Sequence, residues 1–132
     1  MSTELASGAT LDASALLAML QSEPGGEIVE KQISRAAISA VNWSEVIQKA
    51  NERGLATEGL RSALEALGLQ VIDFSAEQAE CTARLRAATR FLGLSLADRA
   101  CLALALERGE PAFTTDRAWG DLSVGVEIQM LR

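Results

Sequence analysis

The sequence predicts an α/β fold, in which a mostly parallel sheet of four to five strands lies between two layers of helices. Short apolar runs suited to buried strands alternate along the chain with longer segments of helical periodicity. Strands that alternate with helices form a mostly parallel sheet whose connecting helices cover both faces. The chain has 132 residues, 48% of them hydrophobic, which is enough for one domain and too few for two, so we expect a single domain over residues 1–132.

The first part of the chain contains two strands, each followed by a helix. A short strand is expected at 10–11, and the helical segment SALLAMLQ that follows it stops before the Pro-Gly-Gly sequence at 24–26. The run AAISAV, around 37–41, joins β-branched and small residues without interruption, which is typical of a strand buried on both faces. Helical sequence resumes at Trp43 and ends near Gly54.

Three further strands are separated by helical segments in the rest of the chain. The expected elements are, in order, a helix ended by Gly68, a strand at 70–74, helices at 76–90 and 96–107 separated by a break at 91–93, a strand at 112–114, a short helix after Asp116 and a strand at 126–130. This order of elements supports the parallel sheet, because parallel strands need long crossover connections.

Four of the apolar runs each end on a single carboxylate. They are TLD at Asp12, AISAVNWSE at Glu45, GLSLAD at Asp98 and AFTTD at Asp116. In open parallel sheets, ligands bind outside the carboxyl ends of the strands. Asp12, Glu45 and Asp116 each follow a strand and should meet at that edge. Asp98 can join them from the start of the helix that precedes the 112–114 strand.

A simpler interpretation is that each acid only caps a helix or turn. The spacings that fit capping are Asp12 before SALLAML, Asn42 to Glu45, Ser95 to Asp98, and Asp116 before RAWGDL. A carboxylate at a helix N-terminus gains ~0.3–1 kcal/mol, which is easily lost when several uncompensated carboxylates are forced together. Four converging acids therefore need a cation. Mg²⁺ prefers oxygen ligands and often binds one or two carboxylates together with substrate phosphate, a combination suited to phosphodiester hydrolysis.

The composition excludes several function classes. The net charge of −6, from 12 basic and 18 acidic residues, leaves no broad basic platform, so any contact with nucleic acid must be local. The chain has no histidine, and Cys81 and Cys101 lack the spacing of a zinc site or a disulfide framework, which favours buried, reduced thiols. No apolar stretch reaches bilayer length and the start MSTELASGAT does not resemble a signal peptide, so we expect a cytoplasmic protein that makes no membrane contact.

Five sequence strings together resemble the PIN-domain ribonucleases of the VapC type, which are the toxins of bacterial toxin-antitoxin pairs. The strings are LDASALLAML, EPGGEIV, ISAVNWSEV, GLSLADRACLALAL and TTDRAW. Each string alone is weak, but the five occur in the order and at the intervals of the family and cover nearly the whole chain. The resemblance implies a PIN-like three-layer α/β/α sandwich and an Mg²⁺- or Mn²⁺-dependent endoribonuclease.

The resemblance also implies roles for individual residues. The acidic site of the family falls on Asp12, Glu45, Asp98 and Asp116. In the implied mechanism, the three aspartates hold one or two Mg²⁺ or Mn²⁺ ions, Glu45 acts as a ligand or as a base, and an ion-activated water attacks RNA. The hydroxyl residue that often lies beside the last acid is matched by Thr114 and Thr115, and the polar residue before the glutamate is matched by Asn42.

The implied partners are an RNA substrate, a second copy of the chain in a homodimer and a cognate antitoxin. A homodimer is also favoured by more apolar helical surface than one small sheet can cover. We expect the antitoxin to insert a basic residue of its tail among the carboxylates, because the site is acidic and the chain contains no inhibitory segment.

Several residues near the four acids have two interpretations each. Ser14 either orients a ligand or caps a helix, and Asp121 either lines the rim of the site or is a solvated helix-end acid. Arg99 and Arg117 either contact RNA phosphate or form salt bridges with the acids. Trp43 and Trp119 could stack on a base, but their positions near helix starts favour packing.

Two other functions are compatible with a sheet that carries acids at strand ends. A phosphorylation-controlled receiver domain is similar in layout, and Asp73 does end the third expected strand. However, a receiver has an acidic pair after its first strand, where this chain has Leu11 before Asp12, and a late lysine, whereas the only lysines here are Lys31 and Lys49. The second alternative is a catalytically silent PIN-like binding module, against which the complete set of acids argues.

Overall fold

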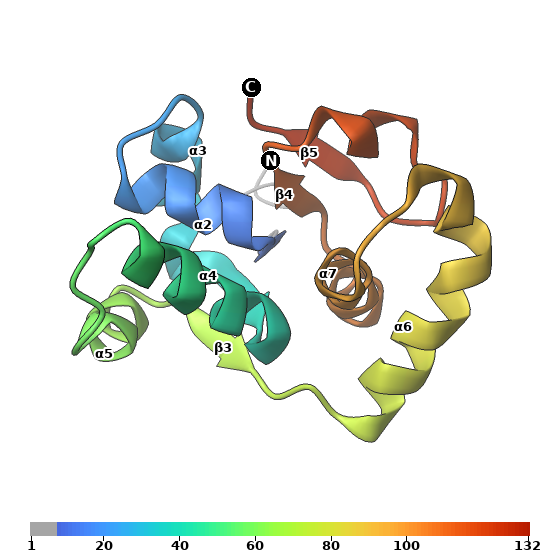
Figure 1. The fold of residues 1–132 in the computed structure, drawn as a ribbon, viewed down its shortest axis with the longest axis horizontal. Helices are drawn as coiled ribbons and strands as arrows, with labels where there is room; N and C mark the ends of the chain where they lie inside the picture. Colours follow the sequence, from blue (N-terminus) through green and yellow to red (C-terminus); the bar gives the residue numbers. More distant parts are fainter. Residues whose placement is uncertain (1–7) are drawn as a thin grey trace, which may run out of the picture.

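The centre of the computed structural model, which describes residues 8–132, is a five-stranded parallel sheet (Figure 1). The strands are β1 (Ala9–Leu11), β2 (Ala36–Ser39), β3 (Gln70–Ile72), β4 (Ala112–Thr114) and β5 (Ile128–Met130). They lie in the order β3-β2-β1-β4-β5, and every neighbouring pair is parallel. The predicted parallel sheet is therefore confirmed, and the carboxyl ends of its strands share one edge.

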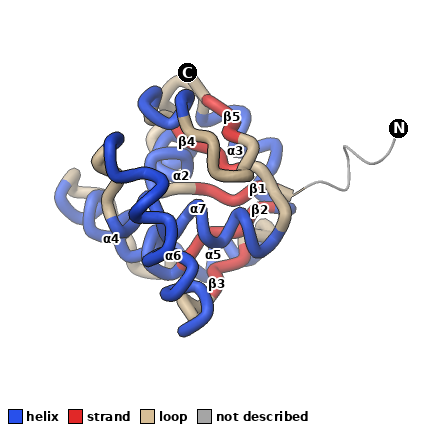
Figure 2. The backbone as a smooth tube through the Cα atoms, turned by 90° about the vertical axis from the view of Figure 1, so that its right-hand side faces the viewer, coloured by secondary structure: helices blue, strands red, loops and turns tan. Residues whose placement is uncertain are grey.

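Helices cover both faces of this sheet, as predicted. The helices are α2 (Ala13–Leu20), α3 (Gly26–Gln32), α4 (Ala40–Glu52), α5 (Leu60–Ala66), α6 (Ala76–Thr89) and α7 (Leu96–Arg108). In Figure 1, α2 to α5 lie on one side of the sheet and α6 and α7 on the other, and Figure 2 shows the strands side by side between them. None of the helices in the described residues is long and apolar enough to cross a membrane. Residues 1–7, part of the start that does not resemble a signal peptide, lie outside the described residues.

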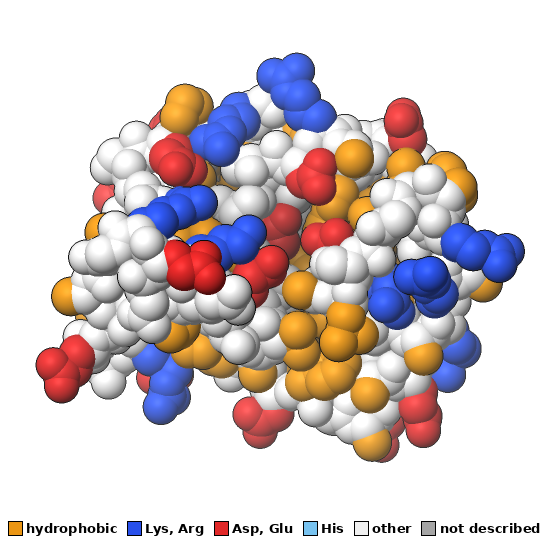
Figure 3. All heavy atoms as spheres, in the orientation of Figure 1, with side chains coloured by type: hydrophobic (Ala, Val, Ile, Leu, Met, Phe, Trp, Pro, Cys, Tyr) orange, Lys and Arg blue, Asp and Glu red, His pale blue; other side chains and the backbone are white. Residues whose placement is uncertain are grey.

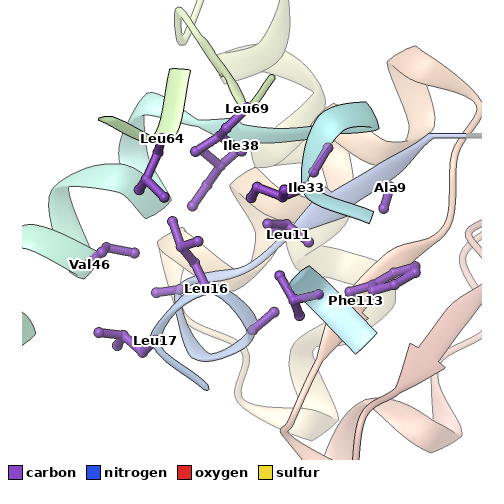
Figure 4. Packing of buried hydrophobic residues seen from close by; sticks show 14 of the residues in the cluster. Ala9, Leu11, Leu16, Leu17, Ile33, Ile38, Val46, Leu64, Leu69 and Phe113 are labelled. Carbon is purple, nitrogen blue, oxygen red and sulfur yellow. The ribbon is translucent and has the colours of Figure 1, made fainter. Parts of the chain in front are cut away.

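Two hydrophobic clusters join these layers. The first contains Leu11 and Ile38 from the sheet and Leu16 from α2, all fully buried, as Figure 4 shows. The second lies on the other face, where Ala112 packs with Cys101 and other residues of α7. The side chain of Phe113, next to Ala112, belongs to the first cluster, because consecutive residues of a strand point to opposite faces.

One difference from the predicted elements is at the end of the second strand. β2 ends at Ser39, and α4 begins at Ala40 rather than at Trp43, because the Ser39 hydroxyl accepts a hydrogen bond from the Val41 N–H and caps the helix. The predicted capping box from Asn42 to Glu45 is therefore wrong, since both residues lie inside α4. The strands predicted at 70–74 and 126–130 are also shorter in the structure.

The helix α3 was not predicted at all, and it depends on two glycines. Gly25 has a φ of +92°, and Gly26 lies so close to α2 that a Cβ atom there would be 2.3 Å from the Ala18 carbonyl oxygen. The Pro-Gly-Gly sequence therefore ends one helix and also allows the next helix to pack tightly against it. The last residues of the chain lie here too, because a Cβ on Gly25 would meet the Leu131 backbone.

We expect Gly26→Ala to destabilise the protein by about 1–3 kcal/mol, because the new methyl group would force the backbones of α2 and α3 apart. Urea unfolding followed by circular dichroism measures this loss. Gly120→Ala is the matched control, since a Cβ there meets nothing within 4 Å and should change stability little. Equal stability of the two variants would show that α3 can move away from α2 without loss.

Candidate active site

The four predicted acids lie at the carboxyl edge of the sheet or on helices beside it. Asp12 directly follows β1, and Asp116 follows β4, the neighbour of β1, by two residues. Glu45 lies in the second turn of α4 and Asp98 in the first turn of α7. Figure 3 shows acidic side chains in a hollow near the middle of this face, with basic side chains around it.

Asp12 is the most constrained of the four acids. It is only 6% exposed and caps α2, accepting a hydrogen bond of 2.8 Å from the Ala15 N–H at Oδ1. The same oxygen accepts a bond of 2.7 Å from the Ser14 hydroxyl, and Oδ2 accepts one of 2.6 Å from the Thr114 hydroxyl. Both carboxylate oxygens are therefore held by hydroxyl groups, one from α2 and one from β4.

The two hydroxyls are themselves fixed by the backbone that follows β4. The Ser14 Oγ accepts a hydrogen bond of 3.0 Å from the Thr115 N–H, and the Thr114 Oγ1 accepts one of 3.0 Å from the Asp116 N–H. Asp12 is thus linked through two hydroxyls to the segment that carries Asp116. The sequence had left the roles of Ser14 and Thr115 open. In the structure, the Ser14 hydroxyl binds Asp12, and Thr115 binds the Ser14 hydroxyl through its backbone N–H.

The carboxyl group of Asp12 is electrostatically unusual. The pKa of this carboxyl group is raised to about 6, mainly by burial and to a smaller extent by the charge of Asp98. The hydrogen bonds from Thr114, Ser14 and Ala15 act in the opposite direction. None of the ion pairs within residues 8–132 includes Asp12. A buried carboxylate that has no basic partner and has another carboxylate nearby is well suited to bind a cation.

Cys101 shows which of the acids come together. Its thiol is fully buried, and its pKa is raised first by burial and then by the charges of Asp12, Asp98 and Glu45. Three of the four acids therefore lie near enough to this thiol for their charges to act on it. The sequence analysis had treated Cys101 only as a buried, reduced thiol, although its position one helical turn after Asp98 was a signal that it lies beneath the site. Both cysteines are free, and Cys81 is half-buried.

The other three acids also make local contacts: Asp98 and Asp116 make the caps that the capping interpretation predicted, whereas Glu45 does not cap a helix. Asp98 and Ser95 form a capping box, with hydrogen bonds of 3.0 and 3.1 Å. Asp116 is exposed and accepts a hydrogen bond from the Ala118 N–H, and Glu45 pairs with Lys49 at 3.8 Å. The cap contacts of Asp98 and Asp116 do not exclude a role at a site, because a residue at the start of a helix can also lie at the edge of the sheet.

The donor set fits a hard divalent cation in its chemistry, though its geometry is not that of a closed metal cage. As placed, no group of three or more acids or cysteines within residues 8–132 is close enough to hold an ion. Oxygen ligands are the ones that Mg²⁺ and Mn²⁺ prefer, and Asp12 supplies one that is buried and already oriented. Glu45, Asp98 and Asp116 would have to turn from their local partners toward it.

The basic and aromatic residues near the acids have different surroundings. Arg99 donates a hydrogen bond of 2.9 Å to the Thr82 carbonyl on α6, so its guanidinium is bound within the helix layer. Arg117 is exposed beside Asp116. Trp119 is fully buried and Trp43 packs against the first hydrophobic cluster, which confirms the packing interpretation of both.

One cavity in the described part of the chain lies away from these acids. A cavity of about 240 Å³ lies at the amino ends of the strands, where Arg35, Arg108 and Glu110 contribute to its wall. Arg108 and Glu110 already pair with each other at 2.8 Å. The acids lie at or beside the opposite, carboxyl edge of the sheet, which is where ligands bind to open parallel sheets.

The hydroxyl links to Asp12 lead to a testable expectation for Thr114→Val. This nearly isosteric change removes the donor to Asp12 Oδ2 and the acceptor of the Asp116 N–H, so we expect a loss of about 1–3 kcal/mol of stability. The pKa of Asp12 should also rise further, since the lost hydrogen bond lowers it. NMR titration of the Asp12 carboxyl carbon measures this shift. An unchanged pKa would mean that Thr114 does not hold the carboxylate.

Comparisons with known proteins agree with this arrangement. The sequence model of the PIN domain matches residues 9–124. No match was found among curated protein sequences. Among solved structures, a chain of a toxin-antitoxin complex from Klebsiella pneumoniae is 23% identical with a TM-score of 0.70, over 92% of this chain and 100% of that one.

Two further structures share the fold. A chain of DNA-bound VapBC from Salmonella typhimurium is 23% identical with a TM-score of 0.69, over 96% of this chain and 99% of that one. The Mycobacterium tuberculosis toxin VapC20, described as cleaving the sarcin-ricin loop, is 16% identical with a TM-score of 0.69, over 91% and 99%. Such low identities show the fold alone, whereas the PIN model covers most of the chain. This protein therefore belongs to the PIN domain family.

Proposed function

We propose that this protein is an Mg²⁺- or Mn²⁺-dependent endoribonuclease and the toxin of a VapC-type toxin-antitoxin pair. The observation that carries the proposal is Asp12, a buried carboxylate that forms no ion pair within residues 8–132 and feels the charge of Asp98 at the carboxyl edge of the sheet. The similarity to VapBC structures and to an RNA-cleaving toxin supports it. We propose that residues 1–132 form one PIN domain and that the protein acts in the cytoplasm.

In the proposed mechanism, Asp12, Asp98 and Asp116 would hold a cation, and Glu45 would be either a further ligand or the base that accepts a proton from water. A divalent ion supplies Lewis acidity, which makes water more acidic and neutralises negative charge that develops on the phosphodiester. The hydroxyls of Ser14 and Thr114 keep both oxygens of Asp12 oriented. With no histidine in the chain, carboxylates are the groups available as bases at neutral pH.

The proposed partners follow from the same site. RNA is the substrate, and Arg117, exposed beside Asp116, is positioned to contact its phosphate. The antitoxin would insert a basic side chain among the acids, whose charges have few cationic partners. The homodimer is favoured by exposed apolar side chains on the described surface, of which Phe91 is the most exposed at 78%.

The proposal predicts RNA cleavage that requires a divalent ion. Protein purified free of antitoxin should cleave RNA when Mg²⁺ or Mn²⁺ is added and stop when EDTA is added, because the acids alone supply no Lewis acid. Gel analysis of a mixed RNA pool measures this, and adding excess Mn²⁺ after EDTA should restore cleavage. Cleavage that persists in EDTA would refute the metal mechanism. Metal binding without cleavage of any RNA would favour the silent binding module.

A further inference from the structure

Asn42 connects the two helices that carry Glu45 and Asp98. Its side chain is 1% exposed, and its Nδ2 donates a hydrogen bond of 3.0 Å to the carbonyl oxygen of Ala97. Ala97 lies in the first turn of α7, directly before Asp98. Asn42 lies three residues before Glu45, so both are on the same face of α4.

This hydrogen bond crosses between the two layers of the protein. α4 packs in the first hydrophobic cluster through Val46, whereas α7 packs in the second cluster through Cys101 and its neighbours. Figure 1 shows α4 and α7 on opposite sides of the region where the sheet ends. Among the side-chain hydrogen bonds within residues 8–132, that from Asn42 is the one that joins these helices directly. It therefore adds a directional polar contact to the packing of α4 against α7.

Asn42 is a poor choice for stability alone. Its Oδ1 is buried and has no hydrogen-bond partner within the described part of the chain. A buried acceptor that has lost its water ligands without gaining a donor weakens a fold, and an apolar side chain of similar size would avoid that loss. An asparagine is better explained by the position it gives to α7 than by the stability it adds.

We propose that Asn42 is a positioning residue of the acid site. By holding the first turn of α7 against α4, it keeps the backbone of Asp98 where its carboxylate can turn toward Asp12 and Glu45 to share a cation. This inference rests on the proposed function, since the shared cation is part of that proposal. Asn42 itself touches neither the cation nor RNA.

The test compares Asn42→Leu with Thr89→Val. Thr89 is also buried, and its hydroxyl donates a hydrogen bond of 2.8 Å to the Leu85 carbonyl within α6, away from the acids. For both variants and the wild type, we would measure Mn²⁺ affinity by calorimetry, the melting temperature without metal, and kcat and KM for RNA. Asn42→Ala, which adds no bulk, is the second variant if Asn42→Leu does not fold.

We expect Asn42→Leu to bind Mn²⁺ about tenfold more weakly or worse and to lose kcat by a similar factor. KM for RNA should change little, and the melting temperature should stay the same or rise, because an unpartnered polar atom is removed. Thr89→Val should keep the wild-type Mn²⁺ affinity and kcat even if it melts earlier. A purely structural role would instead lower Mn²⁺ affinity only in step with the melting temperature, and that result would overturn the proposal.

The proposal and the function on which it rests fail in different ways. A wild type that binds no Mn²⁺ refutes the proposed metal site. If Asn42→Leu binds Mn²⁺ as tightly as the wild type does, only the proposed role of Asn42 is refuted. A crystal structure of metal-free Asn42→Leu decides independently of any metal: α7 should have moved relative to α4, and an unchanged separation of Asp98 from Glu45 overturns the proposal.

Discussion

Asp12→Asn should abolish RNA cleavage while making the metal-free protein more stable. Cleavage should fall at least about a hundredfold, because the variant loses the buried, pre-oriented ligand of the proposed cation. Stability should rise because the carboxylate is desolvated, has no basic partner among residues 8–132 and lies near Asp98. Residues that are required for activity often reduce the folding stability of the protein, as we expect here for a carboxylate that is placed to bind a ligand.

The size of the stabilisation follows from the pKa of Asp12. A rise from 3.8 to about 6 corresponds to about 3 kcal/mol against the charged form. Asparagine keeps an acceptor for Ser14 and Ala15 but turns its NH₂ group toward the Thr114 hydroxyl. The lost hydrogen bond reduces the stabilisation by roughly 1 kcal/mol. The net gain of about 2 kcal/mol should raise the melting temperature by roughly 4–8 °C.

The gain should depend on pH in a defined direction. Because the folded pKa is raised, wild-type Asp12 is mostly protonated in both states below pH 3.8 and then costs no stability. The loss of folding stability grows as the pH rises from 3.8 to about 6 and is complete above that. The melting temperature of Asp12→Asn should therefore exceed that of the wild type most above pH 6, and the difference should vanish near pH 4. Thermal scans in EDTA across this range measure it.

Asp73→Asn is the matched control for this experiment. Asp73 follows β3 as Asp12 follows β1, but its side chain is exposed. It should keep cleavage and show no stability gain that depends on pH. If Asp12→Asn lost activity because it unfolds, the simple capping role of Asp12 would be the better explanation.

The sequence predicted the order of strands and helices because apolar periodicity and glycine breaks report local structure directly. It could not predict α3, since the Pro-Gly-Gly sequence that ends one helix gave no sign that Gly26 lets another pack against it. It also misplaced the start of α4, because Ser39 suits both the end of a strand and a helix cap. For α3 the outcome was decided by packing between separate helices, and for α4 by a local cap that competes with continuation of the strand.

For the site, the sequence could place the acids at the correct edge but could not separate capping from ligand binding. The reason is geometric: in a parallel α/β protein, the residue that ends a strand is often the one that caps the next helix. Asp12 and Asp98 make cap hydrogen bonds, and the charge of Asp98 also raises the pKa of Asp12. The links from Ser14 and Thr114 to Asp12, and the Cys101 thiol below the acids, depend on contacts between β4, α2 and α7 that no local pattern reports.

Trp119→Ala should cause the largest loss of stability among single core substitutions in the second cluster. The indole is fully buried and is the largest of the buried side chains, in the short helix η3 (Arg117–Asp121) that follows Asp116. Removing it should destabilise the protein by about 3–5 kcal/mol, a large part of the roughly 5–15 kcal/mol of a typical domain. Guanidinium unfolding of metal-free protein followed by circular dichroism measures the loss.

The same variant tests whether Trp119 supports the site or only the core. Trp119→Phe keeps most of the ring and removes the indole Nε1, which is buried without a partner in the described structure, so its loss should stay below about 2 kcal/mol. If the role of Trp119 is packing, Trp119→Phe should bind RNA as tightly as the wild type, whereas a base-stacking role would weaken binding at unchanged stability.

Trp43→Ala, in which a half-buried indole is lost from the first cluster, should fall between Trp119→Ala and Trp119→Phe in stability, because partial exposure leaves less buried area to remove. A Trp119→Ala protein as stable as Trp43→Ala would show that η3 contributes little to the fold and that the position of Asp116 is set by Thr114 and β4 alone.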